Sequence, residues 1–281
     1  MSIGLMIFAT EDTIDVVTLA KRAEHLGFDS LWLPEHPIIP VGFKTAFPGG
    51  GEMPEYYKHM PDPFVALAAA AGATTKLKVG TAIHLVPERN VLHAAKEIAT
   101  ADFVSGGRFL LGIGAGWLKE EGDVMGVDFR RRWTQTREHV LAMKQLWTQD
   151  EASFDGKYVK FPKVWSYPTP VQKPHPPILI GGELDQAAAR VAEYGDGWLP
   201  RHIAVKPAEL EAGRKKIEGL YRERGRNPAS LDVTLFGCRP NRDEVKTWFS
   251  AGATRILFVL RPEPARDTLQ RIEKIAVVAI R

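Results

Sequence analysis

Short apolar runs of strand length alternate with helical patterns along the whole chain, and this alternation limits the possible folds more than any other feature. The first unit has a continuous apolar run at residues 3–8, followed by Val16, Leu19, Ala23 and Leu26 at helical spacing. This order of elements favours a parallel sheet whose strands are joined by helices. The other expected strands are residues 28–33, 77–85, the stretch from 109, 177–180, 197–200, 231–236 and 255–260.

Eight such units predict an α/β fold of the (β/α)8 TIM-barrel type, with parallel strands and one domain over residues 1–281. A miscount of one strand would favour an open doubly wound sheet instead. Residues 37–62, rich in proline, glycine and aromatics, predict a long loop after strand 2 that serves as a lid. Residues 151–176 predict an insertion between strands 4 and 5, with a hairpin at 154–159 that turns at Asp155-Gly156.

Three helix positions are also expected. Asp12 or Thr13 is placed to cap the first helix, and a later helix is expected over residues 130–149. Asn241, with Glu244 three residues later, resembles a capping box.

Charge and cysteine content exclude several classes of protein. The chain has 37 Lys and Arg against 34 Asp and Glu and no dense basic run, so nucleic acid is not an expected partner. A single cysteine, Cys238, cannot form an intramolecular disulfide and indicates a reducing, cytoplasmic setting. The first residues do not resemble a signal peptide, and the longest apolar stretch, 64–73, is half the length of a membrane span. We therefore expect a soluble protein that does not bind membranes.

The stretch from Gly107 to Trp117 contains the most unusual backbone. After the apolar run at 109–111, glycine alternates with small or β-branched residues, which leaves the chain with little side-chain cover. Glycine inside a strand indicates close approach of a ligand or of another backbone. The stretch is not a dinucleotide fingerprint, because Trp117 stands where the third glycine would be needed. A strand that ends in a ligand pocket is the better interpretation of these glycines.

The ends of the predicted strands carry two kinds of chemistry. The first four ends supply aromatic, small, His and Glu groups that suit a flat apolar ring, and the later ends supply bare amides and cations that suit a phosphate. A ring with a phosphate tail describes a flavin-type cofactor. The strand ends are Phe8-Ala9-Thr10, Glu35-His36, His84, Gly114 to Trp117, Gly181-Gly182, Arg201-His202, Arg239 and Arg261.

Each candidate also has a purely structural interpretation. His36 could be a loop histidine, Gly181-Gly182 a turn, Trp117 a core residue, and Arg201 and Arg261 solvated charges; position at a strand end is what favours function. Other chemistries lack their motifs. No H-E-x-x-H pattern or other metal-ligand spacing, nucleophile elbow or Walker loop is present, so no metal site is expected.

The chain resembles the bacterial luciferase-like monooxygenase superfamily, in particular its branch of coenzyme F420-dependent oxidoreductases. The blocks that carry the resemblance occur in the family's order over nearly the whole chain. They are residues 30–36 (SLWLPEH), 48–51 with 62–67, 79–82, 96–117 (KEIATADFVSGGRFLLGIGAGW), 177–182 and 195–200.

This resemblance implies residue roles and partners. His36 matches a catalytic histidine near the reacting face, and Glu35 an acidic neighbour that can contact the ring. The Ala82-Ile83 bond falls where relatives have a cis peptide that forms a bulge behind the ring. The other expected cofactor contacts are Phe8, Gly114, Trp117, the amides of Gly181 and Gly182, and Arg201 or His202. Trp117 replaces the catalytic glutamate of the branch's sugar-phosphate dehydrogenases. The sugar-phosphate substrate of those enzymes is therefore not expected here. A homodimer is also implied.

The expected activity is hydride transfer between the C5 carbon of F420, a deazaflavin, and a small organic substrate. His36 would hydrogen-bond or exchange a proton with the substrate, since imidazole titrates near neutral pH. The alternative is an FMN-dependent two-component monooxygenase of the same superfamily, and a third possibility is a non-catalytic flavin-binding accessory protein. The aromatics of the lid suggest a partly apolar substrate, although they could equally pack on the barrel rim.

Overall fold

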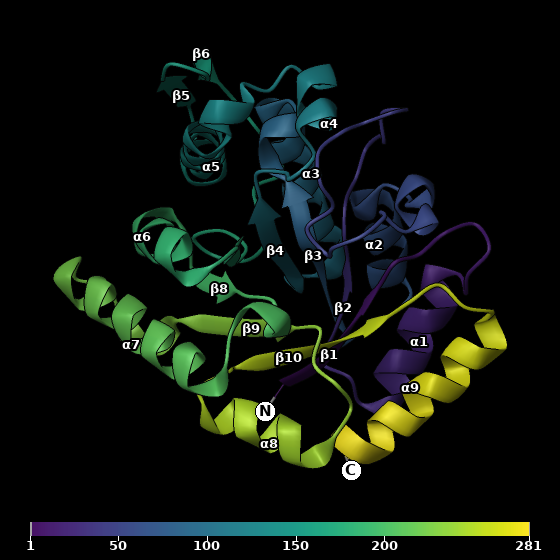
Figure 1. The fold of residues 1–281 in the computed structure, drawn as a ribbon. Helices are drawn as coiled ribbons and strands as arrows, with labels where there is room; N and C mark the ends of the chain where they lie inside the picture. Colours follow the sequence, from purple (N-terminus) through teal and green to yellow (C-terminus); the bar gives the residue numbers. More distant parts are fainter. Residues whose placement is uncertain (1, 281) are drawn as a thin grey trace.

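Eight parallel strands close into a barrel in the computed structural model, which describes residues 2–280 (Figure 1). The order around the barrel is β1-β10-β9-β8-β7-β4-β3-β2, and every neighbouring pair is parallel. The predicted (β/α)8 TIM barrel is thus confirmed. The strands are β1 (Ser2–Ile7), β2 (Ser30–Leu33), β3 (Lys78–Leu85), β4 (Phe109–Gly114), β7 (Ile178–Gly181), β8 (Gly197–Leu199), β9 (Asp232–Phe236) and β10 (Arg255–Leu260).

Eight main helices surround the strands (Figure 1). Their apolar faces pack on the outside of the barrel, which gives the two-layer core of this fold. Within residues 2–280, no helix has the length and apolar character needed to cross a membrane. The helices are α1 (Val16–Leu26), α2 (Pro63–Gly72), α3 (Val91–Ser105), α5 (Arg132–Thr148), α6 (Leu184–Tyr194), α7 (Pro207–Glu223), α8 (Arg242–Ser250) and α9 (Ala265–Ala279).

The expected helix starts were partly wrong. Asp15, not Asp12 or Thr13, caps α1 by accepting from the Thr18 amide at 2.8 Å. The Thr13 hydroxyl instead donates to the Thr10 carbonyl at 2.9 Å, in a turn before the helix. The cap at Asn241 is confirmed, because its side chain accepts from the amides of residues 243 and 244.

The segment between β4 and β7 holds more structure than predicted. A short helix, α4 (Lys119–Val124), comes before α5 and was missed. The hairpin consists of β5 (Ala152–Asp155) and β6 (Lys160–Val164) and lies beside α5 at the edge of the molecule (Figure 1). Its turn spans residues 156–159 rather than Asp155-Gly156, because Glu138 of α5 accepts from the Tyr158 amide at 2.7 Å and holds the longer loop.

The inside of the barrel is filled by side chains. Arg255 lies at the N-terminal end of β10 and bridges Asp29 at 3.0 Å and Asp232 at 2.9 Å. These two ion pairs join β10 to β9 and to the residue before β2 at the bottom of the barrel. Above it, the interior cluster consists of Met6, Trp32, Ala82, Leu110, Leu179, Leu199 and Leu257.

Candidate functional site

The candidate site lies at the C-terminal ends of the strands, which in this fold is the face that binds ligands. Four partly exposed side chains pack on top of the interior cluster and form a floor at this end: Phe8, Ile83, Phe236 and Val259. A floor of apolar groups with partial access suits one face of a flat ring. Phe8 and Ile83, both expected to contact the cofactor, lie in this floor, and Ala82 lies just below it in the interior. Their contact with a cofactor stays a prediction.

His36 is held from two sides. Its Nδ1 lies 2.6 Å from Oε2 of Glu121, and the indole Nε1 of Trp117 donates to its Nε2 at 3.1 Å. The side chains of His36 and Glu121 are only 5% and 0% exposed, so both contacts are shielded from water. The structure therefore brings two predicted residues, His36 and Trp117, together and adds Glu121, which was missed.

The lid packs its aromatic side chains on these residues. Tyr57 lies 5.5 Å from His36 and 5.3 Å from Phe8 between ring centroids. Phe47 lies 5.6 Å from Trp117, and Phe43 6.3 Å from it. These aromatics pack on the rim, and their contact with a substrate stays a prediction. They form an apolar wall over the mouth.

Helix α4 fastens the lid to the barrel through two adjacent glutamates. The Glu120 carboxylate accepts from the Lys44 amide at 2.8 Å and from the Thr45 hydroxyl at 2.6 Å. These hydrogen bonds, that of Thr45 first, lower the pKa of Glu120 to about 2. Glu121 accepts from the Ile38 amide at 3.4 Å as well as contacting His36. The only signal in the sequence was a pair of acids shortly after Trp117, which local patterns cannot separate from a solvated surface pair.

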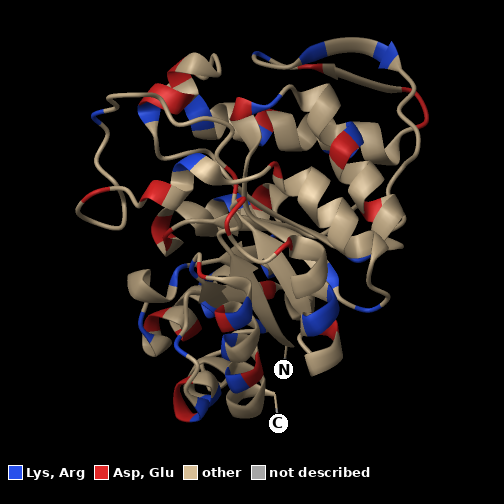
Figure 2. Cartoon of the chain, turned by 90° about the vertical axis from the view of Figure 1, so that its right-hand side faces the viewer, with Lys and Arg blue, Asp and Glu red and all other residues tan. Residues whose placement is uncertain are grey.

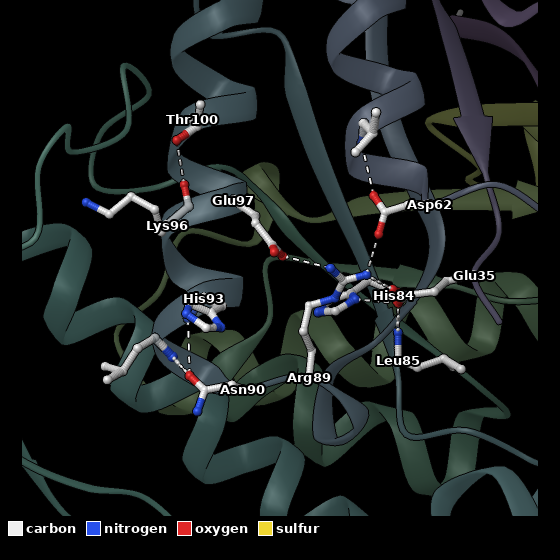
Figure 3. Close-up of polar contacts among 12 residues, drawn as sticks. Glu35, Asp62, His84, Leu85, Arg89, Asn90, His93, Lys96, Glu97 and Thr100 are labelled. Atoms are coloured by element: carbon white, nitrogen blue, oxygen red, sulfur yellow. Dashed lines mark hydrogen bonds and ion pairs between the residues drawn. The ribbon is translucent and has the colours of Figure 1, made fainter. Parts of the chain in front are cut away.

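Glu35 belongs to a second network, on the outer side of the site (Figure 3). Its Oε2 lies 2.5 Å from Nδ1 of His84 and accepts from the Leu85 amide at 2.7 Å, and its Oε1 accepts from Arg89 at 2.5 Å. Burial would raise the pKa of Glu35, but His84 and Arg89 outweigh it and lower the pKa to about 2. Glu35 therefore anchors the end of β3, and its expected contact with a cofactor ring stays a prediction.

Arg89 extends this network to the lid. It contacts Asp62, the last lid residue and the cap of α2, at 2.7 Å, and Glu97 of α3 at 3.0 Å (Figure 3). Arg89 thereby joins β2, the lid and α3 around one guanidinium group. Bidentate and multiple carboxylate contacts are the geometry that arginine favours.

The glycines of β4 make room for β3. A Cβ on Gly112 would lie 2.1 Å from the Thr81 carbonyl oxygen, and one on Gly114 would lie 2.0 Å from Cδ1 of Ile83. The register of β3 shifts between Thr81 and His84, and the Ala82-Ile83 peptide bond is cis, as the resemblance implied. The close approach of the Thr81 backbone accounts for Gly112, and the Ile83 side chain fills the space beside Gly114. These two neighbours, rather than the expected ligand, explain why both positions are glycine.

An open pocket of about 270 Å³ lies beside this floor, lined by Gly182, Glu183, Gln186, Arg201 and Ala204. Gly182 has a φ of 120°, and a Cβ there would meet nothing within 4 Å. Its carbonyl accepts from the Trp198 indole at 2.9 Å. Because the C=O and N–H of a trans peptide point in opposite directions, the next amide, at the start of α6, points away from Trp198. Such an amide with a nearby arginine fits a phosphate.

The remaining predicted contacts are placed as follows. Gly181 lies beside the floor, since a Cβ there would be 3.3 Å from Cγ2 of Ile83. Arg201 lies near enough to Tyr57 of the lid to affect its pKa. Burial raises the pKa of Tyr57 to about 12, and the positive charge of Arg201 partly offsets this rise. His202 packs instead against Gly237, with Nδ1 2.8 Å from where a Cβ would stand.

A third glutamate lies buried behind the site. Glu88, only 3% exposed, has an oxygen, Oε2, that finds no hydrogen-bond partner among the described residues 2–280. Burial, reinforced by the charges of Glu121 and Glu35, raises its pKa to about 9. Glu88 is therefore neutral at physiological pH.

On the outside of the molecule, acidic and basic segments are interspersed over the helices (Figure 2).

These features define a class of protein: a (β/α)8 barrel with a shielded histidine, an apolar floor and a polar pocket that contains Arg201 and Glu183 on the ligand-binding rim. Residues 3–258 match the luciferase-like monooxygenase family, and the chain belongs to that family. Members of the family are oxidoreductases, and this chain is an enzyme of that class.

Individual relatives extend over the whole chain. An uncharacterized protein of Mycobacterium tuberculosis is 35% identical, covering 98% of each chain. The crystal structure of the monooxygenase RslO1 from Streptomyces bottropensis has a TM-score of 0.81 at 20% identity, covering 99% of this chain and 98% of that one. An F420-dependent secondary alcohol dehydrogenase in complex with an F420-acetone adduct has a TM-score of 0.77 at 20% identity, covering 100% and 99%. At such identity the two structural likenesses concern the fold.

Proposed function

We propose that this protein is an F420-dependent oxidoreductase that transfers a hydride between the deazaflavin C5 carbon and a small organic substrate. The observation that carries the proposal is the state of His36. An indole N–H can only donate, so the Nε2 of His36 that accepts it at 3.1 Å carries a lone pair. A proton acceptor at the barrel mouth suits hydride transfer, because an alcohol that loses a hydride from carbon must also lose a proton from oxygen.

The residues present fit the cofactor. Phe8 and Ile83 would support the ring, and the Gly182 segment with Arg201 would hold the phosphate in the adjoining pocket. When bound, F420 supplies the carbon that takes up or gives a hydride. The protein's own contribution is to orient the substrate at Nε2 of His36 and to exclude water with the lid aromatics.

An FMN-dependent two-component monooxygenase is the second candidate. The name of the matched family favours it, and the floor and pocket would hold an FMN ring and phosphate as well. His36 favours the first candidate.

A homodimer in the cytoplasm belongs to the same proposal. The resemblance supports the dimer, and Val65 of α2 and Phe103 of α3, 73% and 59% exposed, offer apolar surface for it.

Two measurements test the proposal. Purified protein is titrated separately with F420 and FMN while tryptophan fluorescence is followed, since Trp117 lies at the mouth. Saturable quenching by F420 is expected. Binding of FMN alone, or of neither compound, would overturn the assignment.

The second measurement concerns His36. His36→Ala should keep F420 affinity but lower turnover at least tenfold, about 1.4 kcal/mol in the barrier. His93→Ala, at an exposed histidine of α3, is the matched control and should leave turnover unchanged. Unchanged turnover in His36→Ala would remove this residue from the mechanism.

A further inference from the structure

The environment of His36 determines which of its nitrogens carries the proton. Trp117 donates to Nε2, so a neutral ring must carry its proton on Nδ1, which lies 2.6 Å from Oε2 of Glu121. Each neighbour alone favours the same tautomer: a carboxylate at Nδ1 accepts, and an indole at Nε2 donates. Second partners of this kind commonly set which histidine nitrogen is free to react.

Glu121 is built into the fold for this contact. Its side chain is fully buried, and the Ile38 amide satisfies its other oxygen at 3.4 Å. Burial of a carboxylate is unfavourable unless hydrogen bonds or charges compensate it. No arginine or lysine pairs with Glu121 among residues 2–280, so His36 is its main compensating partner.

We propose that Glu121 is the positioning residue of the site, fixing the proton of His36 on Nδ1 so that the Nε2 lone pair faces the mouth. The catalytic consequence rests on the proposed function. A substrate hydroxyl would replace the Trp117 indole as the donor to Nε2. In the oxidation direction its O–H bond breaks and an N–H bond forms at Nε2, while the hydride leaves the same carbinol carbon for oxidised F420 and a carbonyl remains.

The charge that then develops on the imidazole ring faces the Glu121 carboxylate across 2.6 Å. A preorganised negative group beside a developing positive charge lowers the barrier without any rearrangement. Glu121 would thus act on the rate through His36, without touching the substrate. A residue that merely anchored the lid would have no effect on the tautomer.

The test reads the tautomer directly in the full chain without cofactor. Long-range proton–nitrogen NMR spectra of protein labelled with 15N-histidine, near neutral pH, distinguish the two neutral forms, and His36→Ala assigns the signals among the 8 histidines. The wild type should show His36 with its proton on Nδ1. A proton on Nε2 would overturn the proposal, whatever the cofactor proves to be.

Variants separate Glu121 from its neighbours. Trp117→Phe removes the indole donor, and the proton should then stay on Nδ1 because Glu121 still accepts there; Glu120→Leu should also leave it on Nδ1. When Glu121→Leu is added to Trp117→Phe, the ring should shift toward the Nε2 form, whereas adding Glu121→Gln, which keeps an acceptor, should not shift it. A proton that moves to Nε2 in Trp117→Phe alone would overturn the proposal, because the indole and not Glu121 would then fix the tautomer; if the double variant with leucine does not fold, Trp117→Phe still decides.

Kinetics then test the consequence. With F420, Glu121→Leu should lower kcat at least tenfold and change KM less than twofold, and Glu121→Gln should lose less. A loss confined to KM would contradict a positioning role. If the wild type shows no F420 activity, the proposed function fails, while the tautomer of His36 remains a separate test of Glu121.

Discussion

At the scale of single residues, the buried carboxyl group of Glu88 makes a prediction about pH. Below its ordinary pKa of 4.5, Glu88 is protonated in the folded and the unfolded chain alike. As the pH rises from there toward about 9, the unfolded chain releases this proton and the folded chain keeps it. The wild type must therefore lose stability relative to a variant with a neutral side chain across this range.

Glu88→Gln should consequently raise the Tm, by an amount that grows between about pH 5 and pH 8. Thermal unfolding of both proteins at several pH values measures the difference, and comparison with the wild type cancels the titration of all other groups. A Tm difference that does not change with pH would show that Glu88 is ionised in the folded protein.

Glu35→Gln should give the reverse trend, because the pKa of Glu35 is lowered in the folded protein. The Tm of this variant should lie below that of the wild type, and the difference should narrow as the pH falls from about 4.5 toward 2.

Residue by residue, the sequence located part of the site. His36 and Trp117 could be singled out because each follows a strand, and the structure places them 3.1 Å apart. Glu121 could not, because it lies in a six-residue helix whose function is visible only once β2 and β4 are neighbours of β3. Gly112 was expected to lie against a ligand, and the structure instead places the Thr81 carbonyl beside it.

At the scale of elements, α4 connects the lid to the barrel. The Thr45 hydroxyl and two lid amides bind Glu120, while the lid's other end is held through Asp62 and Arg89. The middle of the lid, including the 3-10 helix Glu55–His59, is held by aromatic packing and by the contact of His59 with Glu11 at 2.7 Å. The lid is therefore held near each end and at this helix.

Thr45→Val should loosen the first of these clamps. The change removes a 2.6 Å hydrogen bond to a carboxylate and keeps the side chain's shape, so the free energy of local opening should fall by about 1 to 2 kcal/mol. Hydrogen exchange of residues 37–50 followed by mass spectrometry measures this. Exchange there should speed up about five- to thirtyfold, while α3 stays as protected as in the wild type. Thr75→Val, at an exposed threonine hydroxyl bound to Glu24 at 3.4 Å, is the control and should not affect the lid.

At the scale of the whole molecule, the two ends of the barrel have different tasks. At the bottom, Arg255 of β10 forms ion pairs with Asp29 and Asp232. At the top, Arg201 lines the pocket that also contains Gly182 and Glu183. In (β/α)8 barrels the top face carries function and the bottom face stability. The same substitution at these two arginines should therefore affect different properties: the stability of the fold at Arg255, and cofactor binding at Arg201.

Arg255→Met should lower the free energy of unfolding by about 3 kcal/mol, since it leaves two partly buried aspartates without their cation. Cofactor affinity should change less than twofold. Arg201→Met should instead weaken cofactor binding about tenfold and leave unfolding unchanged within about 0.5 kcal/mol. Denaturant unfolding and fluorescence titration of both variants measure the two effects, and equal losses of stability would contradict the division of tasks.

The order of the barrel strands and of the eight main helices, though not α4, was determined by the sequence alone, because apolar spacing, glycine and proline act within a few residues of where they stand. The same local signals placed His36, Trp117 and Gly182 at strand ends, and barrel closure follows from eight repeated β-then-α units. What only the tertiary structure decided are the contacts between segments far apart in the chain. Glu121 reaches His36 across 85 positions, and Glu35 reaches Leu85 across 50. A hydrogen bond depends on distance and direction in space, and these are fixed only when the barrel has closed.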